Sequence, residues 1–155
     1  MAGAGNRRRV ADPPTSLATM TVELNETVRG LLDAQHPAVL STINPDGSPQ
    51  SSVIWVTRDG GDLLVSTEQG RRKERNIVRD GRVGLTVFDL ANPFRYVEIR
   101  GTATVTEDVG RVVAVRIAEE YMGPGAGKEY ADAPAEAVRV VVRITPTKVL
   151  GNAAR

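Results

Sequence analysis

Cysteine is absent from this 155-residue sequence, and histidine occurs only once, at His36. Without cysteine there is no disulfide framework, no thiolate zinc site and no thiol nucleophile. A lone histidine that precedes a proline, with no carboxylate or second histidine beside it, favours a structural role over a metal site or a catalytic triad. We therefore expect neither metal nor hydrolytic chemistry, and we name no catalytic side chain.

An excess of charge of one sign is also absent, since 20 Lys and Arg are matched by 19 Asp and Glu. Such a balance does not predict a nucleic-acid partner, so any anion site must be local. No apolar run approaches the roughly 18 residues that span a bilayer, and the arginines at 7–9 are not followed by an apolar stretch typical of a signal peptide. We expect a cytoplasmic protein with no membrane partner.

Two regions differ in composition. Residues 1–19 are small, polar and proline-rich without periodicity, which predicts a disordered tail, because such a segment cannot offset its ordering entropy by burial. Residues 20–155 have the length of one domain with a sizeable core.

Helical periodicity appears in two long segments. From Glu23 the sequence "ELNETVRGLLDAQ" has apolar residues at i, i+4, i+7 and i+8, as in an amphipathic helix. A second helix is predicted over residues 108–121, where one side carries Val109, Val112, Val113, Ile117 and Tyr121.

Short β-branched runs make up most of the remaining sequence and predict six strands. Turn signals such as "NPDGSP" and "RDGGD" separate the first three, which we expect to form an antiparallel meander. Six antiparallel strands with few helices favour a small closed or split barrel, whereas the lack of regular strand–helix alternation disfavours a parallel Rossmann sheet. The predicted strands are 37–43, 50–57, 62–67, 82–89, 95–106 and 138–145.

The strand at 50–57 offers two faces to a possible ligand. Ser52, Ile54 and Val56 share one face, and Val53 and Trp55 share the other. Either set could form the floor of a cleft, although core packing alone would account for Trp55.

The stretch "STEQGRRKERN" at 66–76 predicts an anion site or a solvated helix. Ser66 and Thr67 end a strand, Gly70 permits an unusual backbone angle, and a helix is predicted over 71–80 with Gly81 as its stop. A helix N-terminus binds phosphate well, whereas cationic side chains there oppose the helix dipole unless an anion compensates.

A helical wheel separates the side chains of this helix. Lys73 lies about 40° from Ile77 and so flanks the apolar stripe, with Asn76 on the same side, whereas Arg75 and Arg79 point toward solvent. On the residues alone, a phosphate site and a solvated helix are equally supported.

The glycine-rich stretch "GPGAGKEY" at 123–130 is not a phosphate loop. That motif needs Gly-Lys-Ser/Thr after four intervening residues, but Lys128 is followed by Glu129. The stretch also follows a predicted helix instead of a strand, so we expect a flexible connector.

Together, "AVLSTINPDGSPQSSVIWV", "LLVSTEQGRRKERNIVRDGRVGLTVFD", "NPFRYVEIRGTATVTED" and "VVVRITPTKVLG" resemble the pyridoxamine-5′-phosphate-oxidase-like superfamily, specifically its coenzyme F420-dependent branch. The resemblance covers roughly residues 23–151. It implies a mainly β fold with flanking helices, a six-stranded antiparallel split β-barrel of the FMN-binding type. It also implies a homodimer with two cofactor clefts at the interface.

The resemblance further implies which residues bind the cofactor. Arg72 and Lys73 would hold its phosphate with Arg71 nearby, and Ser66 and Thr67 would reach the phosphate or the ribityl chain. Asn76 is a further candidate, and Phe94 and Tyr96 would approach the cofactor from the partner subunit. The strand beside the tricyclic ring would contribute Ser51, Ser52, Val53 and Ile54.

Pyridoxamine phosphate oxidases carry an Arg and a Lys on their second strand and an Arg and a His near the C-terminus, which this sequence lacks. The resemblance therefore implies an F420-dependent oxidoreductase that transfers a hydride between the deazaflavin and a conjugated small-molecule acceptor, with no side-chain base required. An FMN-dependent oxidase or reductase of the same fold, and a carrier that binds flavin or deazaflavin without turnover, are the alternatives.

Overall fold

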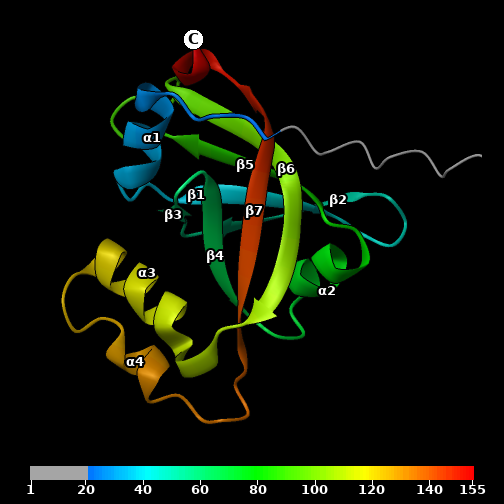
Figure 1. Ribbon diagram of the computed structural model, residues 1–155, viewed down its shortest axis with the longest axis vertical. Coiled ribbons are helices and arrows are strands. Elements are labelled where there is room, and N and C mark those ends of the chain that lie inside the picture. Colours follow the sequence, from blue (N-terminus) through cyan, green and yellow to red (C-terminus); the bar gives the residue numbers. More distant parts are fainter. Residues whose placement is uncertain (1–20) are drawn as a thin grey trace, which may run out of the picture.

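A single antiparallel sheet with four surrounding helices forms the body of the protein in the computed structural model, which describes residues 21–155 (Figure 1). The predicted tail at 1–19 lies outside this range. Within it, no helix is long and apolar enough to cross a membrane. The helices are α1 (Glu26–Asp33), α2 (Arg72–Arg79), α3 (Val112–Met122) and α4 (Lys128–Ala131), with 3-10 turns at Val109–Arg111 and Asn152–Ala154. The strands are β1 (Ala38–Ile43), β2 (Pro49–Ile54), β3 (Thr57–Asp59), β4 (Asp62–Glu68), β5 (Arg82–Phe88), β6 (Tyr96–Glu107) and β7 (Arg139–Leu150).

The order of strands across the sheet is β2-β1-β5-β6-β7-β4-β3, with every neighbouring pair antiparallel. The mainly β class with flanking helices is thus confirmed. β1 pairs with β2 and β3 pairs with β4, as the turn signals predict. The two hairpins do not form one meander, because β5, β6 and β7 lie between them; that prediction was wrong.

The sheet has seven strands, not six, because the predicted strand at 50–57 breaks at Trp55 and Val56. The Val56 N–H donates to the Tyr121 hydroxyl at 3.1 Å, and the Val56 carbonyl oxygen lies 3.2 Å from the same hydroxyl. Both backbone groups of Val56 are therefore used by a side chain instead of a strand. β2 and β3 are the two edge strands of an open sheet, and Trp55 and Val56 connect them.

The core lies inside the curved sheet and under α1. The fully buried side chains include Leu40 of β1, Leu85 of β5 and Ile99 of β6. α1 begins at Glu26, later than predicted, because the Asn25 side chain caps it by accepting from the Val28 N–H at 2.8 Å. The α1 face formed by Val28, Leu31 and Leu32 closes the core.

The longest strands, β6 and β7, pair along most of their length around a bulge between Arg100 and Gly101. A Cβ atom at Gly101 would lie 2.4 Å from the Thr145 carbonyl oxygen. Only glycine permits this close approach of the two backbones.

The predicted helix at 108–121 is interrupted near its start. Gly110 (φ 71°) and Arg111 (φ 57°) leave the helical region, so α3 begins only at Val112. Val109 and Val112 are then 78% and 66% exposed, contrary to the prediction that they share the apolar side. α3 instead buries Ala114, Ile117 and Ala118.

Candidate functional site

A cleft of about 230 Å³ lies between the ends of β2 and β4, the start of α2 and the inner side of α3. We call it the cation cleft, because three of its lining side chains are positively charged. Its lining residues are Val53, Ile54, Trp55, Ser66, Thr67, Glu68, Arg71, Lys73, Ala114, Ile117, Tyr130 and Arg139.

The turn before α2 directs its first residues toward this cleft. Gly70 has φ +89°, as its place in the sequence predicts, and its N–H donates to Glu74 Oε2 at 3.1 Å. The Glu74 side chain thus reaches back to the turn, much as in a capping box. Arg71 is the N-cap residue, and its side chain makes no capping hydrogen bond. The N-cap position of α2 therefore holds a cation and not an acidic or hydroxyl side chain.

α2 ends at Arg79, with Asp80 as its C-cap in an extended conformation. Gly81 follows, but its φ is not positive, so it is not a left-handed stop. A Cβ at Gly81 would lie 2.7 Å from the Ala103 carbonyl oxygen, and close packing on β6 therefore explains the glycine.

Lys73 is the half-buried cation of the cleft. Burial lowers the pKa of its ammonium group below the usual 10.5, and the neighbouring charges of Arg71 and Arg139 lower it further. Among residues 21–155 its Nζ has no hydrogen-bond or ion-pair partner. An anion in the cleft would offset both the cost of burying this positive charge and its repulsion by the two arginines.

Arg71 is less constrained than Lys73. Its guanidinium lies 3.7 Å from the Glu68 carboxylate, and the two side chains are 67% and 41% exposed. An ion pair this exposed contributes little to stability, so the guanidinium remains available to a ligand.

Arg139 is the one cation of the cleft that the sequence analysis did not single out. It begins β7 and pairs in register with Glu68 at the end of β4. Its Nη2 donates to Ser66 Oγ at 2.9 Å, and its guanidinium carbon lies 5.0 Å from the centre of the Tyr130 ring. Nothing in the local pattern "EAVRVVVRI" separates Arg139 from Arg143; only the register of β7 on β4 does so, because Arg139 lies opposite Glu68 and Arg143 opposite Leu64.

Six of the predicted site residues meet in the cation cleft: Val53, Ile54, Ser66, Thr67, Arg71 and Lys73. Arg72 does not, because it borders a separate hollow beside Asn44, Pro45 and Asp46. Successive helical residues point about 100° apart, so Arg72 and Lys73 could not share one direction.

The two serines of β2 face opposite sides of the strand. The Ser51 hydroxyl hydrogen-bonds the Ser41 hydroxyl at 2.8 Å, outside the cleft. The Ser52 Oγ atom is buried and has no hydrogen-bond partner among the described residues. Neither side chain lines the cation cleft.

Asn76 is a buried residue of α2, and its side chain faces β1. Its amide nitrogen donates to Thr42 Oγ1 and Asn44 Oδ1, both at 3.0 Å, so the amide anchors α2 to β1 and does not line the cleft. Arg79, expected in solvent, is exposed but donates to Asn76 Oδ1 at 3.3 Å and to the Ile43 carbonyl oxygen. The expectation that Arg75 faces solvent is confirmed.

Phe94 and Tyr96 lie away from the cation cleft of their own chain. They are 84% and 41% exposed, and Asn152 bonds the Phe94 carbonyl at 2.6 Å and the Tyr96 N–H at 3.0 Å. Asn152 therefore fixes the backbone that presents both aromatic rings at the surface. Their contact with a partner's cofactor stays a prediction.

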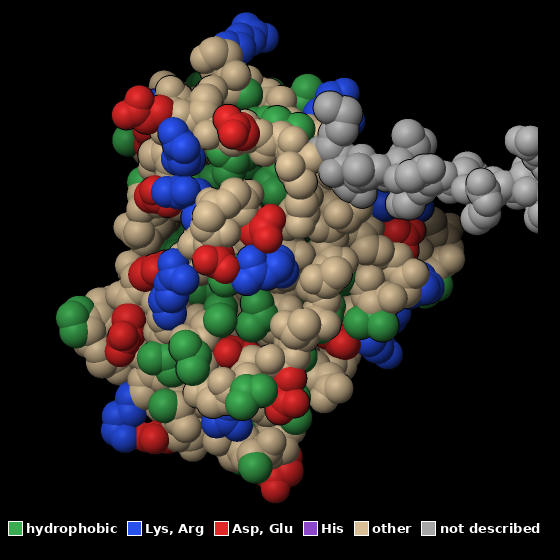
Figure 2. Space-filling model, in the orientation of Figure 1, with side chains coloured by type: hydrophobic (Ala, Val, Ile, Leu, Met, Phe, Trp, Pro, Cys, Tyr) green, Lys and Arg blue, Asp and Glu red, His purple; other side chains and the backbone are tan. Residues whose placement is uncertain are grey.

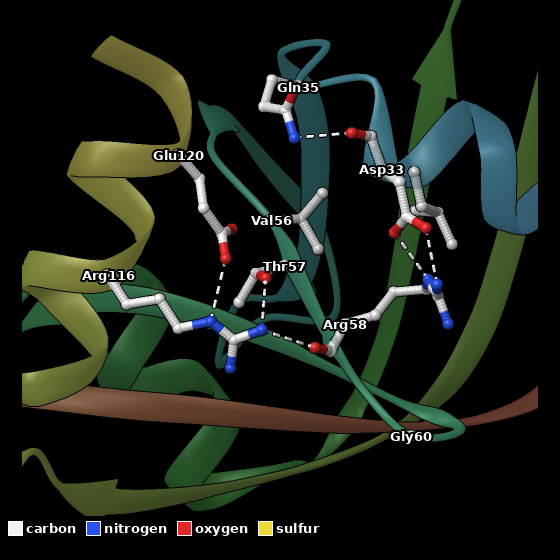
Figure 3. Close-up of a pocket in the computed structure, with 9 residues that line it drawn as sticks. Asp33, Gln35, Val56, Thr57, Arg58, Gly60, Arg116 and Glu120 are labelled. Carbon is white, nitrogen blue, oxygen red and sulfur yellow. Dashed lines mark hydrogen bonds and ion pairs between the residues drawn. The ribbon is translucent and has the colours of Figure 1, made fainter. Parts of the chain in front are cut away.

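A larger cavity of about 370 Å³ lies on the other side of the β2–β3 link, but its charges are already paired (Figure 3). Arg58 Nε donates to Asp33 Oδ1 at 2.7 Å, and Arg116 Nε donates to Glu120 Oε1 at 2.9 Å. Arg116 also donates to Thr57 and to the Arg58 carbonyl. Because these groups satisfy one another, the cavity has no unmet charge for a ligand to fill.

The surface of the protein carries charges of both signs. On the face shown in Figure 2, positive and negative side chains are interspersed. No group of three or more His, Asp or Glu side chains among the described residues could hold a metal ion. With the side chains of Arg71, Lys73, Arg139, Ser66 and Thr67, the cleft can bind and orient an anionic ligand through hydrogen-bond donors.

Comparison with known proteins now defines the class. The family described as pyridoxamine 5′-phosphate oxidase matches residues 24–153, and this chain belongs to that family. The chain is 28% identical over 142 residues to an F420H(2)-dependent biliverdin reductase of Mycobacterium tuberculosis (strain CDC 1551 / Oshkosh), covering 89% of this chain and 95% of that protein.

Solved structures support the same fold. A structure described as an F420 reductase superposes with a TM-score of 0.71 at 31% identity, covering 82% of this chain and 98% of the other. A conserved hypothetical protein from Mycobacterium tuberculosis superposes with a TM-score of 0.68 at 25% identity, covering 87% and 88%. The resemblance read from the sequence motifs is confirmed for the family and for a mainly β fold with flanking helices, but not for a six-stranded barrel.

Proposed function

We propose that this protein is a coenzyme F420-dependent oxidoreductase that transfers a hydride between the deazaflavin and a conjugated small-molecule acceptor. The observation that carries the proposal is Lys73, a half-buried cation without a partner among the described residues, beside Arg71 at one end of a cleft whose wall is β2. Relatives described as F420-dependent reductases support the choice of cofactor.

The donor set of the cleft suits the phosphate of such a cofactor. Arg71 and Lys73 would supply charge-assisted hydrogen bonds, and the hydroxyls of Ser66 and Thr67 would supply neutral ones. Arg72 would contact the ligand only if it extended around the start of α2. Asn76 would act indirectly, by holding α2 against β1.

β2 would form the wall beside the ring system. Val53 is 70% exposed, whereas Ile54 is buried at 8%, so the end of this strand offers one bare apolar side chain to a ligand. When bound, the cofactor supplies the hydride chemistry; the protein's task is to orient it and exclude water from one face.

A second copy of the chain would complete the site. The cleft measures about 230 Å³, whereas pockets that enclose a drug-sized ligand usually measure about 300–1,000 Å³. In a homodimer, the partner's exposed Phe94 and Tyr96 side chains would add an aromatic wall to the cleft, beside Trp55 and Tyr130 of this chain.

Titration of the protein with coenzyme F420 and with FMN, followed by fluorescence, tests the choice of cofactor. We expect tighter binding of F420; tighter binding of FMN would favour a flavin enzyme instead.

Turnover separates an enzyme from a carrier. Protein-bound reduced F420 should be oxidised faster when quinones, enones or tetrapyrroles are added. If no acceptor in a broad panel accelerates oxidation, the protein is a carrier and the proposed activity is wrong.

A further inference from the structure

Arg139 joins the cation cleft from a segment that the motif at 66–76 does not include. Its position at the start of β7, opposite Glu68, places its guanidinium against the end of β4. The Nε atom of Arg139 is buried and has no hydrogen-bond partner among the described residues. A buried donor without a partner is unfavourable, so the guanidinium is held in place by its other contacts, the hydrogen bond to Ser66 and the Tyr130 ring.

The hydrogen bond to Ser66 has a direction. Arginine can only donate, so Ser66 Oγ accepts from Arg139 Nη2 at 2.9 Å. The hydroxyl hydrogen of Ser66 then remains free to donate elsewhere, and Ser66 lines the cation cleft. Arg139 thus makes the Ser66 hydroxyl a donor toward a ligand.

The guanidinium is held in this position by the segment between α3 and β7. The Tyr130 ring lies 5.0 Å from it, within the range of a cation–π contact. Arg111 holds the backbone of this segment by donating to the carbonyl oxygens of Tyr130 at 2.9 Å and Ala137 at 3.3 Å, and to those of Ala133 and Pro134. Arg139 is therefore positioned before any ligand binds, which lowers the entropy lost on binding.

We propose that Arg139 is the third cation of the phosphate site and that it orients Ser66 as a donor, so that the site selects ligands carrying an ionised phosphate ester. This inference rests on the proposed function, which places a cofactor phosphate in the cation cleft. With Arg71, Lys73 and the Ser66 hydroxyl, Arg139 forms a set of donors. Glu68 is the one carboxylate that lines the cleft among the described residues, and it pairs with Arg71.

The first test compares a phosphorylated ligand with its phosphate-free counterpart. Arg139→Gln should weaken binding of coenzyme F420 at least tenfold, corresponding to about 1.4 kcal/mol. Binding of the deazaflavin chromophore that lacks the phosphate should stay unchanged. Equal weakening of both ligands, or of neither, would overturn the inference.

Arg143→Gln is the matched control. It removes the same charge from the same strand, but Arg143 pairs with Asp59 and Asp62, outside the cleft. This variant should bind coenzyme F420 with wild-type affinity. An equal loss of affinity in both variants would mean that net charge alone matters, and would refute a specific role for Arg139.

A double-mutant cycle tests the orientation of Ser66. Ser66→Ala should weaken F420 binding about fivefold to tenfold in the wild-type background, but less than twofold in the Arg139→Gln background. Additive effects would show that Arg139 does not act through Ser66. A purely structural role for Arg139 would not produce this coupling.

A third arm does not depend on the cofactor. Inorganic phosphate should perturb the NMR signal of the Lys73 Nζ group in the wild-type protein and in Arg143→Gln, and it should do so at least tenfold more weakly in Arg139→Gln. If the wild type binds phosphate in this way but neither F420 nor FMN, the proposed function fails and the phosphate site stands. If Arg139→Gln binds phosphate like the wild type, the inference fails whatever the cofactor.

Discussion

Replacing Lys73 by methionine keeps most of the side-chain stem and removes the charge. A charge-assisted hydrogen bond to a phosphate contributes about 1.5–3 kcal/mol, so the substitution should weaken cofactor binding roughly tenfold to 150-fold. Because Lys73 Nζ has no partner among the described residues, the loss should appear in binding and not in the stability of the free protein.

The free protein should respond in the opposite direction. Burial and the charges of Arg71 and Arg139 disfavour the ammonium group, so Lys73→Met should be at least as stable as the wild type without ligand. Between the lowered pKa of folded Lys73 and 10.5, the unfolded chain binds more protons than the folded chain. The contribution of Lys73 therefore makes the free energy of unfolding rise with pH in that window, and this contribution should vanish in Lys73→Met.

Fluorescence titration with coenzyme F420 and urea unfolding at several pH values measure the two effects separately. Lys73→Arg is the control that keeps a positive charge, and it should retain more affinity than the methionine variant. Unchanged F420 affinity in Lys73→Met would refute the phosphate assignment. A free protein destabilised by more than about 1 kcal/mol would refute the view that Lys73 has no structural partner.

Three further predictions concern the framework around the cleft. Asn76→Ala leaves Thr42 and Asn44 without their shared amide donor and should lower the free energy of unfolding by about 1–3 kcal/mol in urea; no change would contradict its anchoring role. Tyr121→Phe should keep the stacking of the ring on Trp55, at 5.0 Å between ring centres, yet lower the free energy of unfolding by about 1 kcal/mol, because the hydroxyl hydrogen bonds to Val56 are lost. Because burial raises the pKa of Tyr121 above 10.0, its contribution makes wild-type stability fall as pH rises through 10, and the phenylalanine variant should lack that decline in denaturation at pH 8 and 10.5. Gly101→Ala should sharply lower the melting temperature, since its Cβ would lie 2.4 Å from the Thr145 carbonyl, whereas Gly84→Ala, whose nearest neighbour would be 4.0 Å away, should not; equal melting temperatures would argue against the close approach.

Local patterns predicted the features that local interactions determine. The Asp-Gly turns correctly predicted the hairpins β1–β2 and β3–β4, and Gly70 with its positive φ correctly marked the turn before α2. The order of the strands could not be predicted in this way, because β5, β6 and β7 enter the ladder between the hairpins through pairings distant in sequence. The break at Val56 likewise depends on Tyr121, which lies 65 residues further along the chain.

The candidate site shows the same division. Ser66, Thr67, Arg71 and Lys73 lie in one short motif, and the structure gathers them in one cleft. Arg139 comes from the far end of the chain, so no local signal could identify it. Asn76 does not line the cleft, because its amide donates to two acceptors on and beside β1, which a helical wheel does not reveal.

The order of the strands gives the two walls of the cation cleft different places in the sheet. Val53 lies on the edge strand β2, and Ser66 lies on β4, next to the opposite edge strand β3. No ladder joins β2 to β3, so these edges can separate without breaking a strand–strand hydrogen bond. A ligand that contacts both walls would bridge these two edges of the sheet, and amide hydrogen exchange in β2 and β3 would slow on binding. Local unfolding of the ligand-free protein would then begin at the cation cleft itself.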